Sequence, residues 1–287
     1  MWLVFAVGSA VFAGITAILT KIGVKSVSSD LVTALRTSVV VIFSWLMVLI
    51  VGSVSDISSI SSFTLLFLTL SGLSTGISWF MYNRALQLGD VNKVTPVDKS
   101  STVLTILLAF IILGEAPTVY KIIGMTLITA GTLMMTVKRS SVRTENHRQG
   151  WVLYAAGSAF FAALTSIFGK IGVKDIESNL AVAIRTIVVL IMAWLIIMIK
   201  KKTITLKTVD KRSWIFIILS GIATGLSWLC YYRALQLGQA SVVVPIDKLS
   251  ILITILFSYL VLKEKLTKTA TIGLLLLTAG TLSLLIQ

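Results

Sequence analysis

Long apolar stretches alternate with short polar segments along the whole chain, and single polar residues interrupt some of the stretches. Each stretch approaches the roughly 20 residues that an α-helix needs to cross the hydrocarbon core of a bilayer. The pattern therefore predicts an all-α membrane protein with ten transmembrane helices. The predicted spans are residues 3–24, 31–51, 63–86, 91–113, 120–137, 151–173, 180–199, 214–235, 240–262 and 269–286.

The second half of the chain repeats the first. The string WLVFAVGSAVFAG from Trp2 matches WVLYAAGSAFFAA from Trp151, and SGLSTGISWFMYNRALQLG from Ser71 matches SGIATGLSWLCYYRALQLG from Ser220. Both matches have an offset of 149 residues, so the alignment runs without an insertion. Because each copy has five spans, an odd number, the second copy enters the membrane from the opposite side, which predicts two inverted five-helix repeats. The predicted divisions are a first five-span repeat at 1–138, a basic linker at 139–150 and a second five-span repeat at 151–287.

Composition supports a membrane location and argues against a nucleic-acid-binding protein. Hydrophobic residues make up 56% of the 287 residues and charged residues only 13%, whereas soluble domains carry about 25% charged residues. The formal charge of +14 comes from short basic runs between apolar stretches, so no nucleic-acid partner is expected. The single Cys230 and the single His147 favour neither a disulfide nor a metal site, and no cofactor is expected.

The basic residues gather in alternate loops. They concentrate after predicted spans 1, 5, 7 and 9 and around the connection between spans 3 and 4, and these loops share one face if the second repeat is inverted. Lys121, Lys170 and Lys174 are the exceptions. Short cytoplasmic loops are enriched in lysine and arginine, so the pattern places this face and the linker in the cytoplasm and both termini outside.

Ionisable residues inside the predicted spans occur in pairs related by the repeat. Charge inside a membrane is costly and usually faces a cavity or a partner, so these residues are the first candidates for a substrate site. Basic groups outnumber aspartates, which favours an anionic or zwitterionic substrate bound through a carboxylate or phosphate. The alternative is that each aspartate forms a structural ion pair with an arginine or with the neighbouring lysine. The pairs are Arg36 and Arg185, Asp98 and Asp247, and Lys99 and Lys248.

Two prolines precede the Asp-Lys pairs. Pro96 and Pro245 each remove a backbone donor and loosen the helix beside the charged residues. We therefore predict a hinge at each proline, within a broken helix that binds substrate.

Aromatic and small residues are also paired by the repeat. Trp79 and Trp228, with Tyr82 and Tyr231, are candidates to stack on a substrate ring or cation, although such residues are more often interfacial anchors. A glycine face on the fifth span of each copy permits close helix packing, or a homodimer interface. Glu115 and Glu264 follow their spans and are expected to be helix caps or solvated loop residues. The glycines of that face are Gly124, Gly131, Gly273 and Gly280.

Several strings resemble the EamA branch of the drug/metabolite transporter superfamily: the span opening WLVFAVGSAVFAG, the string ALRT, the ALQLG that closes the third span, and IILGEAPTVYKIIGMTLITAGTLMM. The resemblance covers nearly the whole chain, and each half resembles the half-length, five-span members. It implies a ten-helix bundle with a central cavity between the halves that exports metabolites, amino acids or drugs. Two features depart from the family pattern: members are expected to have cytoplasmic termini, and many have a proline where this chain has Thr102 and Ile251.

These observations predict a multi-pass protein of the plasma membrane, a secondary transporter for a small polar metabolite that is amino-acid-like or otherwise anionic or zwitterionic. We expect efflux by alternating access around a midplane site, with protons as the coupling ion through Asp98 or Asp247. The alternatives are an exporter of cations or drugs with the aspartates as counter-ions, a lipid-translocating protein, and a channel. The sequence contains no phosphate-binding glycine loop, nucleophile elbow, HExxH or CxxC, so an enzyme is not expected.

Overall fold

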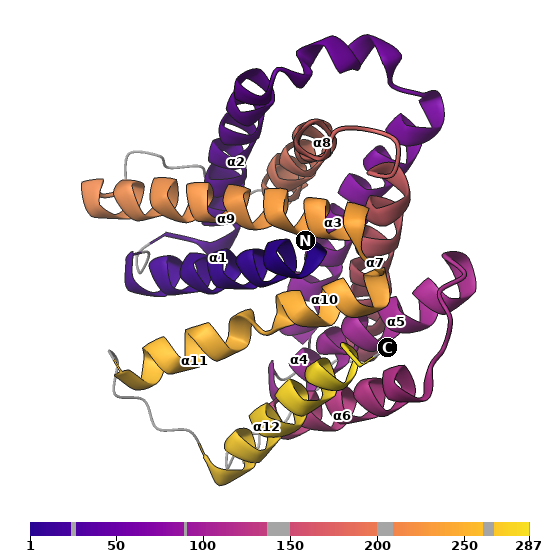
Figure 1. Cartoon of the computed structure of the whole chain (residues 1–287). Coiled ribbons are helices and arrows are strands. Elements are labelled where there is room, and N and C mark those ends of the chain that lie inside the picture. The colour runs from indigo at the N-terminus through magenta and orange to yellow at the C-terminus, as the bar shows by residue number, and fades with distance from the viewer. Residues whose placement is uncertain (24–26, 89–90, 137–149, 200–208, 261–266, 287) are drawn as a thin grey trace.

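The computed structural model describes residues 1–23, 27–88, 91–136, 150–199, 209–260 and 267–286, and their regular structure is entirely helical (Figure 1). The first half contains α1 (Trp2–Gly23), α2 (Ser29–Val51), the 3-10 helix η1 (Ser53–Ser59), α3 (Ser62–Leu88), α4 (Val91–Lys99), α5 (Ser101–Ile112) and α6 (Val119–Thr136). The second half contains α7 (Trp151–Gly172), α8 (Ser178–Ile199), α9 (Lys211–Leu237), α10 (Ala240–Lys248), α11 (Ser250–Leu260) and α12 (Lys268–Ser283).

The distribution of polarity is that of a membrane protein. Apolar side chains lie on the outside, where Val4, Ile111 and Leu153 are 74%, 79% and 73% exposed. Ser71 and Ser158, in contrast, are fully buried. Seven stretches of helix in the described residues are long and apolar enough to cross a bilayer, and α6 contributes a shorter apolar helix. The prediction of an all-α, multi-pass membrane protein is confirmed, whereas the ten-helix inverted repeat stays a prediction.

The predicted spans 91–113 and 240–262 are broken helices. α4 ends at Lys99 and α5 begins at Ser101, while α10 ends at Lys248 and α11 begins at Ser250. Each break follows its proline by about one turn of helix. The broken helices are therefore present, and a hinge at each proline stays a prediction.

Local hydrogen bonding accounts for the positions of the breaks. The backbone N–H of Ser100 and its hydroxyl both donate to the carbonyl of Val97, and the N–H of Leu249 donates to the carbonyl of Ile246. These i to i−3 bonds tighten the chain into a 3-10 turn and interrupt the α-helical pattern.

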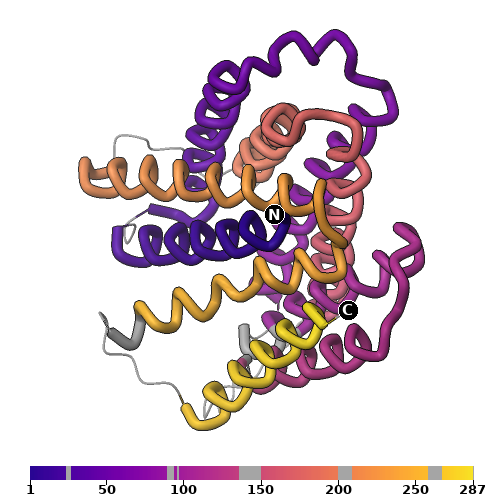
Figure 2. Tube along the Cα trace, in the orientation of Figure 1, coloured from indigo at the N-terminus to yellow at the C-terminus, as the bar shows by residue number. Residues whose placement is uncertain are grey.

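Helix contacts between the two halves occur in matched pairs. α1 packs on α9, and α7 packs on α3, which is the equivalent contact under the 149-residue offset. Figures 1 and 2 show α1 and α9 side by side over most of their lengths. The two helices are antiparallel, because Gly238 lies against Trp2 and Gly23 lies against Phe216. α2 packs on its equivalent α8, and α6 on its equivalent α12.

The predicted glycine face packs within the chain, where it joins α6 to α12. A Cβ atom added to Gly131 would lie 2.5 Å from the carbonyl oxygen of Gly273, and one added to Gly124 would lie 2.7 Å from that of Gly280. The glycines therefore permit backbone contact between the two helices. The close-packing prediction is confirmed, and the face is already occupied without a second copy of the chain.

Candidate functional site

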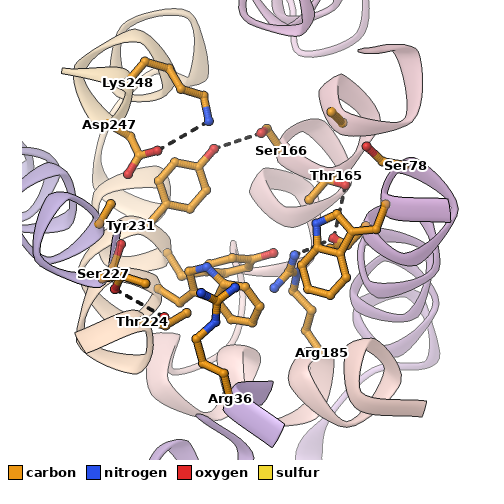
Figure 3. A pocket seen from close by; sticks show the side chains of 17 residues that line it. Arg36, Ser78, Thr165, Ser166, Arg185, Thr224, Ser227, Tyr231, Asp247 and Lys248 are labelled. Carbon is orange, nitrogen blue, oxygen red and sulfur yellow. Dashed lines mark hydrogen bonds and ion pairs between the residues drawn. The ribbon is translucent and has the colours of Figure 1, made fainter. Parts of the chain in front are cut away.

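A cavity of about 350 Å³ lies between the two halves, and we call it the Arg185 cavity (Figure 3). Side chains from α1, α2, α3, α7, α8, α9 and α10 form its wall. Its lining residues are Ala13, Thr16, Arg36, Thr75, Ser78, Trp79, Ala162, Thr165, Ser166, Arg185, Thr224, Ser227, Trp228, Tyr231, Tyr232, Asp247 and Lys248. The volume is at the lower end of the range that small-molecule sites occupy, about 300–1,000 Å³.

The structure brings most of the predicted site residues to this cavity but not all of them. Those that line it are Arg36, Arg185, Trp79, Trp228, Tyr231, Asp247 and Lys248. Asp98 does not line it, and Lys99 lines a second cavity together with Pro245. Tyr82 lines a neighbouring pocket that also includes Arg36 and Trp79. The side chain of Pro96 is outside the described residues.

Arg185 on α8 is held in place by the facing helix α3. Its Nε donates to Ser71 Oγ at 3.0 Å, and its Nη2 donates to Thr75 Oγ1 at 2.7 Å. The guanidinium carbon lies 4.7 Å from the ring centre of Trp228 and 5.2 Å from that of Tyr232, within cation–π range. These contacts fix the plane and direction of the guanidinium group.

One terminal nitrogen of Arg185, which carries two N–H groups, is not used by these contacts. The side chain is only 3% exposed, and Nη1 is buried without a hydrogen-bond partner among the described residues. A buried donor that is unsatisfied costs about 1–3 kcal/mol, and more when it is charged. Because the group lines the cavity, an oxygen of a bound carboxylate or phosphate would satisfy it.

Arg36, the repeat equivalent of Arg185, has a different environment. Its Nη1 reaches Thr20 Oγ1 only at 3.5 Å, the outer limit for a hydrogen bond. It lines the Arg185 cavity and also the neighbouring pocket of about 260 Å³, which extends to Ser29 at the start of α2. The cavity therefore continues toward the face of the bundle where α2 begins.

The two aspartates also differ, although each accepts a hydrogen bond from an equivalent serine. Ser9 Oγ donates to Asp247 at 2.6 Å, and Ser158 Oγ donates to Asp98 at 2.6 Å. Asp247 lines the cavity, where its Oδ2 lies 3.6 Å from Lys248 Nζ (Figure 3). Within the described residues neither aspartate pairs with an arginine, so the ion-pair alternative holds only for Asp247 and its neighbouring lysine.

Several residues of the wall were not predicted from the sequence. Tyr232 closes the cavity beside Arg185, and its hydroxyl lies 3.0 Å from Ser71 Oγ. Its repeat equivalent is Asn83. This difference between the two copies is the feature of the sequence that could have drawn attention to Tyr232. Tyr231 donates to Ser166 Oγ at 2.9 Å across the cavity wall.

Hydrogen bonds between the halves close the face of the bundle where α10 begins. Glu115, which follows α5, accepts from the backbone N–H of Ala240 at 2.6 Å and of Ser241 at 3.0 Å. Glu115 therefore caps the N-terminus of α10. The sequence predicted a cap at this glutamate, and the helix that it caps belongs to the other half of the chain. Lys121 Nζ donates to Gln239 Oε1 at 2.7 Å on the same face.

A second set of bonds on this face joins α7 to the end of α9. Lys170 Nζ donates to the carbonyl of Gly238 at 2.7 Å. Gln236 Nε2 donates to the carbonyls of Val173 at 2.9 Å and Ile176 at 2.8 Å. Lysines 121 and 170, which are exceptions to the loop charge pattern, thus have structural partners here.

Comparison with known proteins identifies a matching family model and related sequences. The model of the EamA-like transporter family matches residues 1–137 and again residues 149–286. A Sinorhizobium protein named "Uncharacterized transporter in cobO 3'region" is 44% identical over 136 residues, which are 47% of this chain and 96% of that protein. An uncharacterized protein of Methanocaldococcus jannaschii is 37% identical over 93 residues, which are 32% of this chain and 66% of that protein.

The fold is shared with a solved protein structure that has 17% sequence identity. The two superpose with a TM-score of 0.82 over 99% of this chain and 96% of the other. The family model covers both halves, and the half-length Sinorhizobium relative corresponds to one of them. The chain therefore belongs to the EamA-like transporter family.

Proposed function

We propose that this membrane transporter is a secondary carrier for a small anionic or zwitterionic solute of about amino-acid size, which it exports across the plasma membrane by alternating access. The observation that carries the proposal is the buried Nη1 of Arg185, which has no partner in the described part of the chain and belongs to a residue that lines the cavity. A carboxylate forms charge-assisted hydrogen bonds with such a donor.

The charge of the Arg185 cavity supports the same substrate class. Arg36, Arg185 and Lys248 contribute three positive charges to the wall, against one negative charge from Asp247. An anion or a zwitterion presenting its carboxylate to Arg185 would offset this excess. Trp228 and Tyr232 present ring faces beside Arg185, which suit a solute with a flat or apolar portion.

Alternating access is supported by the matched contacts between the halves. It is also supported by the difference between the two faces of the bundle, one of which is closed by hydrogen bonds while the other is reached by a pocket. We assign residues 1–138 and 151–287 to two inverted five-helix repeats that rock around the cavity. On one face Glu115 and Lys121 join the two halves, whereas the neighbouring pocket leads from the cavity toward the other face.

The loop charges orient the carrier. The basic linker at 139–150 lies outside the described residues apart from Gly150, so its position follows from the charge pattern. That pattern places the face reached by the neighbouring pocket in the cytoplasm. The structure then corresponds to a cytoplasm-open state, with both termini outside.

A thermal-shift screen of the purified protein in detergent tests the substrate class. A ligand that binds only the folded protein stabilises it by about 2.7 kcal/mol at 100 times its dissociation constant. We expect amino acids or sugar phosphates to raise the melting temperature and quaternary amines to leave it unchanged. Stabilisation by cations alone would contradict the proposal and favour a cation exporter, and the absence of any shift would also contradict it.

Proton coupling gives a separate prediction. Asp247→Asn is expected to abolish proton movement driven by the solute, because Asp247 is the aspartate that lines the cavity, while Asp98→Asn is expected to retain it. The measurement is acidification of proteoliposomes, followed with a pH-sensitive dye after addition of solute. Unchanged proton flux in a folded Asp247→Asn variant refutes the coupling role.

A further inference from the structure

A second cavity of about 310 Å³ adjoins the first, and we call it the Lys99 cavity. Residues of α1, α4, α5, α6, α10, α11 and α12 enclose it. Ala13 and Lys248 line both cavities, so the two spaces share part of a wall. Lys99 lines only the second of them.

Equivalent residues of the two halves meet across this space. Lys99 and Lys248 are 149 positions apart, as are Thr132 and Thr281, and all four line the Lys99 cavity. The cavity therefore lies between equivalent elements, and the repeat brings two lysines to one space inside the bundle.

This arrangement concentrates positive charge. Lys99 and Lys248 lie within electrostatic range of each other and repel, and both are exposed to solvent. The described residues that line the cavity include no carboxylate. Lys99 makes no hydrogen bond or ion pair within the described residues, although Asp98 beside it is close enough to interact electrostatically.

Hydroxyl groups also line the Lys99 cavity, beside the two helix breaks that follow Lys99 and Lys248. The hydroxyl-bearing residues Thr102 and Ser250 are part of the cavity wall. The space thus combines two ammonium groups with hydroxyl groups, a set that matches a carboxylate or phosphate group.

We propose that the Lys99 cavity is a second anion-binding site, which takes a carboxylate or phosphate group between Lys99 and Lys248. The site goes beyond the transport function proposed above, although it shares Lys248 with the Arg185 cavity. Because Lys248 lies 3.6 Å from Asp247, an anion in the Lys99 cavity competes with that carboxylate for the same ammonium group. Removing the charge of Asp247 therefore strengthens anion binding at this site.

Calorimetric titration of the purified full-length protein in detergent with inorganic phosphate, and separately with succinate, tests the proposal. A charged hydrogen bond is worth about 1.5–3 kcal/mol, so Lys99→Gln is expected to weaken binding by about tenfold or more. Lys99→Arg keeps the charge and retains binding, and Asp247→Asn tightens it. Lys174→Gln, which changes a lysine at a different cavity, serves as the matched control and leaves binding unchanged.

The anionic group can belong to a soluble molecule or to a lipid headgroup, and a parallel experiment separates the two sources. Phosphatidylglycerol retention by the same variants is measured by native mass spectrometry. Lys99-dependent binding of phosphate or succinate identifies a soluble anion, and Lys99-dependent retention of lipid alone identifies a headgroup.

Two outcomes would overturn the site. The first is that Lys99→Gln binds phosphate and lipid as the unchanged protein does, or that the unchanged protein binds neither. The second is that Arg185→Gln removes phosphate binding while Lys99→Gln preserves it, because the anion would then occupy the Arg185 cavity. If Arg185→Gln loses only the solute-induced thermal shift and keeps phosphate binding, the result concerns the proposed transport substrate and does not contradict the Lys99 site.

Discussion

Arg185→Gln is expected to remove solute binding almost completely. Glutamine lacks the positive charge and the planar fork of donors, so the bound anion would lose its partner inside the bundle. Truncating one member of a buried, hydrogen-bonded charge pair costs about 2–5 kcal/mol, which corresponds to a weakening of about 30-fold to several thousand-fold. The loss is measured as the disappearance of the solute-induced thermal shift and of uptake into proteoliposomes.

Two further arginine variants make this prediction specific. Arg185→Lys keeps the charge but cannot reach Ser71, Thr75 and the solute together, so intermediate binding is expected. Arg36→Gln is the matched control from the other repeat. Its effect is expected to be smaller because, within the described residues, the Arg36 guanidinium is positioned only by the 3.5 Å contact to Thr20. Undiminished binding by a folded Arg185→Gln protein would refute the assigned role.

Gly131→Ala is expected to have the largest effect on stability. The added Cβ atom would lie 2.5 Å from the carbonyl oxygen of Gly273 and 2.6 Å from the backbone nitrogen of Leu277, so α6 and α12 must separate. Overpacking of this kind costs about 1–3 kcal/mol, and inside a membrane close packing is a main source of helix association. The measurement is the melting temperature of the purified protein in detergent, followed by tryptophan fluorescence.

Gly157→Ala is the matched control for that experiment. Its added Cβ atom would lie 2.3 Å from Cε of Met81, but this is the end of a flexible side chain that can adopt another rotamer. We therefore expect a melting temperature close to that of the unchanged protein. Equal melting temperatures for the two alanine variants would contradict the backbone contact between α6 and α12.

Much of the fold could be predicted from the sequence because hydrophobicity and duplication are local properties of the chain. An apolar stretch of bilayer length has to be helical in lipid, since its backbone groups find no other partners there. The constant offset of 149 residues identified which residues are equivalent, including Arg36 with Arg185 and Asp98 with Asp247.

The positions of the helix breaks could not be predicted in the same way. Pro245 removes one backbone donor, yet α10 continues past it to Lys248. The breaks occur where Ser100 and Leu249 form i to i−3 hydrogen bonds, and neither residue is a strong helix breaker by type.

The sequence by itself determined the apolar spans, the repeat and the paired charges, because each follows from the chemistry of neighbouring residues. Only the tertiary structure decided that one member of the aspartate pair and one of the lysine pair line the Arg185 cavity, whereas both arginines do. Asp247 does so and Asp98 does not, although both accept a bond from an equivalent serine. The physical reason is that equivalent residues of the two halves have different surroundings in a bundle that is closed on one face only. Two nearly identical stretches of sequence do not specify which of them borders the cavity.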